Sequence, residues 1–532
     1  MTLRPCREES VDFDNTQNLY IEGDNLDVLK VLRETYLGKV KMIYIDPPYN
    51  TGNDFVYNDD FADDVSHDAE RSSFRDEDGN ILLEHKLYTK NTESNGRFHT
   101  DWLNMIYPRL KVAKDLLSED GVIFISIDDN EVENLKKVCN EIFGEINVET
   151  LIWNKEAEGS SGTLKATKTT RRIHEYILCI FRNYSEIQFF KIHEALKGRE
   201  NEFQTANLAV NMENEKIGHP NYFTITNPSG EDFTRQWKWS KQEIDELIKQ
   251  DLIYWGSDGH KQPRLIIPTD ERRTTFLLSI LNYGGTTIGR KDFELLMGDS
   301  IEFSYPKPII LLKKLMETAT SKDSLILDFF SGSATTAHAV MKLNAEDGGN
   351  RRFIMVQLPE KTDEKSEAYK AGYKNICEIG KERIHRAGRK IKEELGVKLD
   401  TGFRVLKLDS SNMEDVYYTP QDFSLQSLFN ENVKSDRTNE DLLFQVMLDH
   451  GIELSAKIES KQIAGKEVHF VDDNFLVACF DNNVNETTIT EIAKLKPVYF
   501  VMRDSSAAND NVIDNFEQIF KHYSPDTNCG II

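Results

Sequence analysis

The chain has 532 residues, with 65 Lys and Arg against 90 Asp and Glu, and its formal net charge is −25. This length exceeds what one ordinary core serves, so we expect two to four domains. No apolar run approaches the roughly 18 residues of a membrane span, and the charged start lacks the apolar segment of a secretory signal, so we expect a cytoplasmic protein with no membrane partner.

The spacing of the cysteines and the distribution of charge along the chain each limit what the protein can bind. The six cysteines lie far apart with no CxxC spacing, so we expect reduced thiols and no metal site. Residues 155–291 carry 20 Lys and Arg against 18 Asp and Glu, whereas residues 396–532 carry 12 against 23. Phosphate contacts need basic side chains, so we expect any nucleic acid to meet the middle of the chain and not its C-terminal end.

Residues 18–57 follow the order strand, helix, strand and loop. An apolar NLYI precedes the amphipathic LDVLKVLRETY, and the run KMIYI is closed by DPPYN. A helix and the strand VIFISI follow within residues 101–127, and residues 325–357 contain a strand, a small-residue turn, a helix and the strand FIMVQL. This alternation predicts an α/β fold with a doubly wound, mostly parallel sheet.

Three stretches depart from this alternation. Residues 61–98 are polar and without periodicity, which predicts a long loop. Residues 187–283 contain three tryptophans and a short helix opened by a capping box at Ser240, so we expect an inserted domain. Beyond Gly396 the pattern is mixed α/β. We therefore expect one α/β domain in two parts, an inserted domain and a C-terminal domain, with the bounds 1–186, 187–283, 284–395 and 396–532.

Asp46, Pro47, Pro48 and Tyr49 follow the apolar strand KMIYI. Open α/β sheets bind their ligands at this end of a strand. The Asp46 carboxylate and the Pro47 carbonyl can accept hydrogen bonds from an amine, the Tyr49 ring can stack on a base, and the prolines stiffen the turn. These are the requirements for methylating an exocyclic amine. For an isolated DPPY, the alternative is a proline turn after a buried strand.

A second motif, DFFSGSATT, runs from Asp328 to Thr336, where a predicted strand turns into a helix. Small residues let the backbone approach a ligand closely, and the N–H groups at the start of the helix can receive a carboxylate. Alone, the turn would indicate ordinary strand and helix packing. Its occurrence together with DPPY indicates a cofactor site.

With IEGDNLDVL, IDPPYNTGNDFVYND, YPKPIILLKKLM and LDFFSGSATTAHAV, the sequence resembles the Mod subunits of type III restriction-modification systems. These are β-class DNA amino-methyltransferases, in which DPPY precedes the cofactor motif and a target recognition domain lies between the two. The resemblance covers most of residues 18–155 and 295–418. It implies a Rossmann-like S-adenosylmethionine-dependent methyltransferase fold, in which residues 187–283 are the target recognition domain and residues 396–532 a C-terminal α/β domain for dimerisation or partner binding.

The same resemblance implies an activity and partners. The activity is methyl transfer from S-adenosylmethionine to N6 of a flipped adenine in double-stranded DNA, with Asp46 to Tyr49 as the catalytic tetrapeptide. The implied partners are a second copy of the chain and a restriction subunit with helicase and nuclease activity. Two alternatives stay open: an N4-cytosine methyltransferase, which would use nearly the same site, and a DNA-recognition subunit without catalysis.

By resemblance, Asp24 contacts the cofactor adenine, and Lys307 and Pro308 lie near its methionine part. Asp24 is also placed to cap the helix that follows it. Two positions depart from the family pattern: Ala334 replaces the second glycine of FxGxG, and Gln357 stands where many relatives carry an acidic ribose-binding residue. The expected cofactor residues are Asp24, Asn25, Lys307, Pro308, Asp328, Phe330, Ser331, Gly332, Ser333, Ala334 and Gln357.

We expect DNA to contact basic residues in the middle of the chain, where they are interleaved with aromatic residues, and a polar residue beside the tetrapeptide. About half of these basic side chains are expected to be ordinary solvated charges, and the sequence does not say which. The expected DNA-binding residues are Asn50, Arg171, Arg172, Arg235, Lys238, Lys241, Lys261, Arg264, Arg272 and Arg273.

Overall fold

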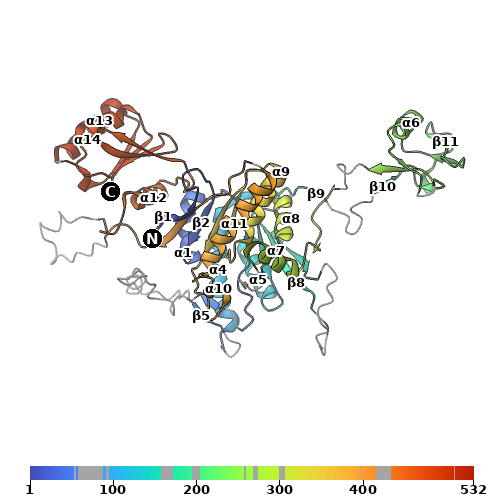
Figure 1. Ribbon diagram of the computed structural model, residues 1–532, viewed down its shortest axis with the longest axis horizontal. Helices are drawn as coiled ribbons and strands as arrows, with labels where there is room; N and C mark the ends of the chain where they lie inside the picture. Colours follow the sequence, from blue (N-terminus) through green and yellow to red (C-terminus); the bar gives the residue numbers. More distant parts are fainter. Residues whose placement is uncertain are drawn as a thin grey trace. The chain divides into compact units, whose positions relative to one another are not determined.

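The computed structural model describes residues 1–52, 55–57, 88–91, 95–156, 170, 172–193, 204–256, 259–267, 274–298, 303, 306–396, 398–414, 433–508 and 510–532. The chain divides into two compact units (Figure 1). The first contains Met1–Phe189 and Leu278–Ile532, and the second contains Phe190–Leu277. The second unit lies within the range predicted for the inserted domain, 187–283, and the four-part domain division itself stays a prediction.

A ten-stranded mixed sheet forms the centre of the first unit (Figure 1). Its middle is parallel, in the order β19 (Phe403–Asp409), β2 (Leu19–Glu22), β18 (Arg352–Gln357), β17 (Leu325–Asp328), β3 (Val40–Ile45) and β6 (Leu117–Ile127). At one edge β1 (Thr2–Val11) runs antiparallel to β19. At the other edge, β8 (His174–Phe181) is antiparallel to β6 and to β7 (Val148–Asn154), and β16 (Ile280–Leu281) is parallel to β7. The predicted α/β class is confirmed, and the sheet is mixed because its edges contain antiparallel pairs.

Helices connect these strands and fall into two groups of neighbours. One group comprises α1 (Asn25–Tyr36), α4 (Phe98–Leu116) and α5 (Val132–Phe143). The other comprises α7 (Thr286–Met297), α8 (Ile309–Ala319), α9 (Thr335–Asp347) and α11 (Ile376–Leu395), with the short α10 (Glu367–Lys370) before α11. A two-stranded ribbon, β4 (Phe55–Tyr57) and β5 (Tyr88–Lys90), lies beside α4. In the described part of the chain, no helix is long and apolar enough to cross a membrane.

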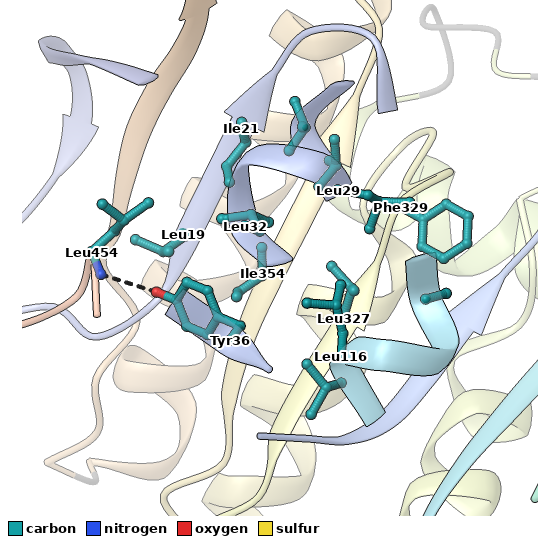
Figure 2. Packing of buried hydrophobic residues seen from close by; sticks show 14 of the residues in the cluster. Leu19, Ile21, Leu29, Leu32, Tyr36, Leu116, Leu327, Phe329, Ile354 and Leu454 are labelled. Carbon is teal, nitrogen blue, oxygen red and sulfur yellow. Dashed lines mark hydrogen bonds between the residues drawn. The ribbon is translucent and has the colours of Figure 1, made fainter. Parts of the chain in front are cut away.

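The core of the first unit forms where α1 meets the parallel strands (Figure 2). Leu29 and Leu32 of the helix pack with Leu19 of β2 and Ile354 of β18. They lie on one face because residues three and four apart in a helix are neighbours. At the end of the same helix, the hydroxyl of Tyr36 accepts a hydrogen bond of 3.0 Å from the backbone N–H of Leu454. The C-terminal part of the chain is therefore tied into this core.

Residues 439–532 add the helix α12 (Asn439–Asp449) and a five-stranded sheet. Its strands are β20 (Ile458–Ile463), β21 (Lys466–Val471), β22 (Leu476–Cys479), β23 (Tyr499–Met502) and β24 (Asn528–Ile531), and it is accompanied by α13 (Glu486–Lys494) and α14 (Asp510–Tyr523). Helix α12 contacts β1 and α1. The buried Arg404 of β19 donates hydrogen bonds to the carbonyls of Phe13, Leu454 and Ala456, at 2.7, 2.8 and 2.9 Å. The main sheet thus includes a strand from beyond residue 396.

Ending the chain after Leu395 is expected to abolish cooperative unfolding of the first unit. The truncation removes β19, which lies between β1 and β2, and so leaves both strands without their shared neighbour. Circular dichroism melting curves test this expectation. A chain ending after Lys457 keeps β19 and α12 and is the control, which we expect to retain a transition at a lower temperature. A chain ending at residue 395 that melts like the full chain would contradict the prediction.

The second unit is built from short antiparallel pairs. Strand β14 (Arg264–Ile267) pairs with β10 (Gln204–Asn207) on one side and with β13 (Ile253–Tyr254) on the other. Strand β11 (Tyr222–Thr226) pairs with β12 (Asp232–Gln236), and β9 (Ile192–His193) pairs with β15 (Thr274–Thr275). Helix α6 (Lys241–Lys249) begins at Ser240 with the predicted capping box. Trp237 is buried against Ile225 and Ile244 in a small core.

Candidate active site

The tetrapeptide begins where β3 ends, at the carboxyl edge of the parallel strands. The indole N–H of Trp102 in α4 donates a 2.7 Å hydrogen bond to the carbonyl of Pro48. This contact fixes the turn, which already has little freedom because two of its residues are prolines. Asp46 and Tyr49 are therefore held by a rigid backbone at the end of a buried strand.

Lys307 forms an ion pair with the carboxylate of Asp46. Its ammonium nitrogen is 2.7 Å from both carboxylate oxygens and 2.9 Å from the hydroxyl of Tyr49. The same nitrogen is 5.1 Å from the centroid of the Tyr49 ring and 5.7 Å from that of Trp153. Burial raises the pKa of the Asp46 carboxyl above its ordinary value, and the neighbouring Lys307 opposes that rise. The expected place of Lys307 beside the methionine part of a cofactor stays a prediction.

Glu175 of β8 is a member of this cluster that the sequence analysis missed. Tyr49 donates a hydrogen bond of 3.0 Å from its hydroxyl to Oε2 of Glu175. Lys155 lies 3.0 Å from Oε1 of the same carboxylate, whose side chain is only 11 % exposed. Burial and the two nearby carboxylates raise the pKa of Tyr49 well above its ordinary value, so its hydroxyl keeps its proton. No motif surrounds Glu175, and it reaches the site only because β8 pairs with β6.

Asn50 follows the tetrapeptide with a left-handed backbone, at φ 59°. Its side-chain N–H groups donate to Oε1 of Glu131 at 2.6 Å and to the Phe98 carbonyl at 3.2 Å, and its amide oxygen accepts from Asn91 at 2.9 Å. The side chain is buried, with 1 % of the residue exposed. In this structure its polar atoms are used inside the protein, and the expected DNA contact of Asn50 stays a prediction.

The second motif forms a tight turn between β17 and α9. Asp328 accepts hydrogen bonds from the Phe330 N–H at 3.1 Å and from the Thr336 hydroxyl at 2.5 Å, and burial raises its pKa to about 7. The N–H of Gly332 donates to the side-chain oxygen of Gln357 at 2.7 Å. In this structure Asp328 and Gln357 hold the turn itself.

A buried arginine donates hydrogen bonds to residues of the same turn. Arg383 of α11 is fully buried and donates to the hydroxyls of Ser333, at 2.8 Å, and Thr335, at 2.6 Å. Phe329 and Phe330 are also buried, and their rings contact each other. The first turn of α9 lies at the same sheet edge as the tetrapeptide, because α9 follows β17 and β17 is parallel to β3.

Asp24 and Asn25 follow the end of β2 and lie at the same edge of the sheet. Asp24 caps α1, because its Oδ1 accepts from the N–H groups of Leu26 and Asp27, at 2.9 and 3.2 Å. The side-chain amide of Asn25 donates to the carbonyl of Phe329 at 2.8 Å. This bond connects the turn after β2 with the turn after β17, so the two predicted cofactor segments are neighbours.

Replacing Ala334 by glycine is expected to stabilise the protein by about 0.5–1 kcal/mol. Ala334 caps α9 in a left-handed conformation, at φ 59° and ψ 41°, which costs energy for a residue with a Cβ. We expect cofactor affinity to stay the same or improve. Urea denaturation and calorimetry measure both quantities. The control is Ala337→Gly in the interior of α9, which should destabilise the protein instead.

The expected DNA-binding residues have different surroundings. Arg235 is engaged within the second unit, where it pairs with Glu215 and donates to Gln262 at 3.2 Å and to the Val210 carbonyl at 3.1 Å. These contacts lie inside that unit, and the expected DNA contact of Arg235 stays a prediction. In the first unit, Arg172 pairs with Asp129 at 3.2 Å. The exposed members are Lys238, Lys241, Lys261, Arg264 and Arg172, and those outside the described residues are Arg171, Arg272 and Arg273.

Comparison with known proteins gives a consistent result. Residues 40–387 match the protein family described as N6 and N4 DNA methylase. The chain is 36 % identical to the type III restriction-modification enzyme StyLTI Mod subunit of Salmonella typhimurium, over 73 % of this chain and 60 % of that protein. It is 32 % identical to the EcoPI Mod subunit of Escherichia phage P1, over 87 % and 76 %. Among solved structures, PvuII DNA methyltransferase (cytosine-N4-specific) aligns at 13 % identity over 73 % of this chain and 99 % of that one, with a TM-score of 0.32.

Proposed function

The chain belongs to the DNA methylase family, among the Mod subunits of type III restriction-modification enzymes, and from this premise we propose that it transfers a methyl group from S-adenosylmethionine to N6 of adenine in double-stranded DNA. One observation supports this most directly. Strands β3 and β17 are adjacent and parallel, so the tetrapeptide and the small-residue turn, far apart in the sequence, meet at one sheet edge.

The residues of the tetrapeptide bind and orient the target. An adenine in a duplex must first be rotated out of the stack, at a cost of a few kcal/mol. The Tyr49 ring then offers a stacking face, and the Asp46 carboxylate and the Pro47 carbonyl accept hydrogen bonds from the amine. Orientation supplies most of the acceleration. No strong base is needed, because the proton leaves a nitrogen that has become cationic.

We propose that the turn from Phe330 to Ala334 and the start of α9 hold the methionine part of S-adenosylmethionine, and that Asp24 and Asn25 lie toward its adenosine part. The residues fit such a group, since small side chains and helix N–H groups suit a carboxylate and Asp24 offers an acceptor. When bound, the cofactor supplies an electrophilic methyl group on sulfur. We take the fold accordingly to be of the Rossmann-like methyltransferase type, with residues 187–283 as the inserted target recognition domain. We propose residues 396–532 as a C-terminal α/β part whose first strand, β19, belongs to the main sheet.

Methylation of DNA by the purified chain tests the proposal. The chain is incubated with unmethylated plasmid and S-adenosylmethionine carrying a labelled methyl group, and the DNA is then digested to nucleosides. We expect label in N6-methyladenine, and long-read sequencing of the same DNA would give the recognised sequence. Label in N4-methylcytosine would overturn the choice of base, and unlabelled DNA would favour a recognition subunit without catalysis.

We further propose that the second unit reads the DNA sequence, because it carries exposed basic residues such as Lys238, Lys261 and Arg264 on a small separate core. Replacing residues 190–277 by the equivalent segment of a relative is expected to change the sequence that is methylated, while the methylated base stays the same. Methylation-sensitive sequencing of DNA from expressing cells measures this. A chimera that keeps the original recognition sequence would count against this division of labour.

Family membership also suggests partners. We propose that the chain pairs with a second copy of itself and with a restriction subunit that supplies helicase and nuclease activity, and that it works in the cytoplasm. The strongly acidic residues 396–532 suit protein contacts better than contacts with DNA, since phosphate would repel them.

A further inference from the structure

We infer that Lys307, in its observed position, occupies the place that the target amine takes, and that Glu175 is the positioning residue that receives Lys307 when the base enters. The inference rests on the proposed function, because it concerns the same tetrapeptide. It assigns a part to Glu175, which belongs to no recognised motif, and gives Lys307 a second position besides the one observed.

Lys307 fills the space that a target amine would need beside Asp46. Its nitrogen is at hydrogen-bond distance, 2.7 Å, from both oxygens of Asp46, and 5.1 Å from the centroid of the Tyr49 ring. An amine held by Asp46 needs the same acceptors, and the nitrogen of Lys307 also lies 2.9 Å from the hydroxyl of Tyr49, at the end of the ring on which the base stacks. The lysine in its observed position and the bound base therefore exclude each other.

Glu175 offers Lys307 a second carboxylate when Lys307 leaves Asp46. The side chain of Lys307 is only 9 % exposed, and a buried ammonium without a counter-charge is costly. Oε2 of Glu175 lies 3.9 Å from the same nitrogen. To vacate the place of the amine the nitrogen must move by about 3 Å. Because Oε2 of Glu175 is only 3.9 Å away, the flexible lysine side chain can make this move around that oxygen and end within hydrogen-bond distance of it. Lys307 can thus leave Asp46 without being left unpaired.

Contacts with Lys155 and Tyr49 hold the Glu175 carboxylate close to Lys307. Lys155 holds the other oxygen of Glu175 at 3.0 Å, and the Tyr49 hydroxyl donates to Oε2 at 3.0 Å. The cluster contains two carboxylates and two ammonium groups, so moving Lys307 from Asp46 to Glu175 leaves its net charge unchanged. Without the Glu175 carboxylate, Lys307 would lose its second carboxylate neighbour, stay paired with Asp46 and compete with the target amine.

The test measures base flipping directly, apart from methyl transfer. Once the recognised sequence is mapped, a duplex carrying 2-aminopurine in place of the target adenine is mixed with the full chain and S-adenosylhomocysteine. We expect a fluorescence rise for the original protein. Glu175→Gln should lower the ratio of flipped to stacked base at least about tenfold, whereas in a Lys307→Met background the same substitution should change that ratio less than about threefold. The control is Glu149→Gln, which removes an exposed carboxylate from the neighbouring β7 and should leave the rise unchanged.

The outcomes separate this inference from the proposed function. An equal loss from Glu175→Gln in both backgrounds would overturn the inference, as would a Glu175→Gln variant that flips the base normally, while methylation by the original protein would still stand. An original protein that neither flips nor methylates the base would overturn the proposed function itself. If Glu175→Gln does not fold, Glu175→Asp keeps the charge but withdraws it from Lys307, and it is compared in the same two backgrounds with the same expectations.

Discussion

Replacing Asp46 by asparagine is expected to lower the rate of methyl transfer by a factor on the order of 10²–10³. Asparagine keeps one acceptor but turns an amide donor toward the target amine, which itself donates. The substitution also removes the carboxylate that Lys307 contacts at 2.7 Å. We expect affinity for S-adenosylmethionine to stay within about threefold of the original, because the proposed cofactor contacts lie in the turns after β2 and β17. Single-turnover kinetics and calorimetry measure the two effects separately.

The control for this variant is Asp120→Asn. Asp120 also pairs with a lysine, Lys41, at 2.6 Å, but it is about half exposed at the start of β6. Exposed pairs contribute little to stability, so the control should keep both its turnover and its cofactor affinity. Near-normal turnover of Asp46→Asn on the mapped sequence would remove Asp46 from the catalytic site.

Local patterns in the sequence predicted the local structure around the site. The run KMIYI is β3 and LILD is β17, each followed by its predicted turn, and the amphipathic segment that begins at Asn25 is α1. These elements could be predicted because periodicity and capping depend on residues that are close in sequence. Strand partners depend on contacts between distant segments. The pairing of β1 with β19, which lie far apart in the sequence, could not be inferred in this way.

The same limit applies to the side chains of the site. Glu175 comes to Tyr49 only through the antiparallel pairing of β8 with β6, and the contact of Lys307 with Asp46 depends on the path of the chain before α8. Basic composition likewise did not distinguish Arg235, which pairs with Glu215 inside the second unit, from exposed residues such as Lys238. Residue type predicts what a group can do, but its partners decide what it does.

Replacing Arg109 by methionine is expected to lower the free energy of unfolding by about 3–5 kcal/mol. Arg109 of α4 is fully buried. Its guanidinium donates to the Asn25 side-chain oxygen, to the Met105 carbonyl at 2.7 Å and to Oδ2 of Asp24 at 3.2 Å. Methionine has a similar length but no donors, so a carboxylate and an amide oxygen would lose a partner in a site with little solvent. Urea denaturation measures the change.

The same substitution tests whether Arg109 also orients the proposed adenosine contact. Asp24 is held by two helix N–H groups as well as by Arg109, so the arginine decides only where Oδ2 points. We expect Arg109→Met to weaken binding of S-adenosylmethionine, and to cost less stability in an Asp24→Asn background, where no charge is left behind. The control is Arg33→Met, which breaks the exposed pair with Asp115 and should cost less than about 0.5 kcal/mol. If Arg109→Met costs as little as that control, the cap of α1 alone holds Asp24, and the link from α4 to the cofactor edge is not needed.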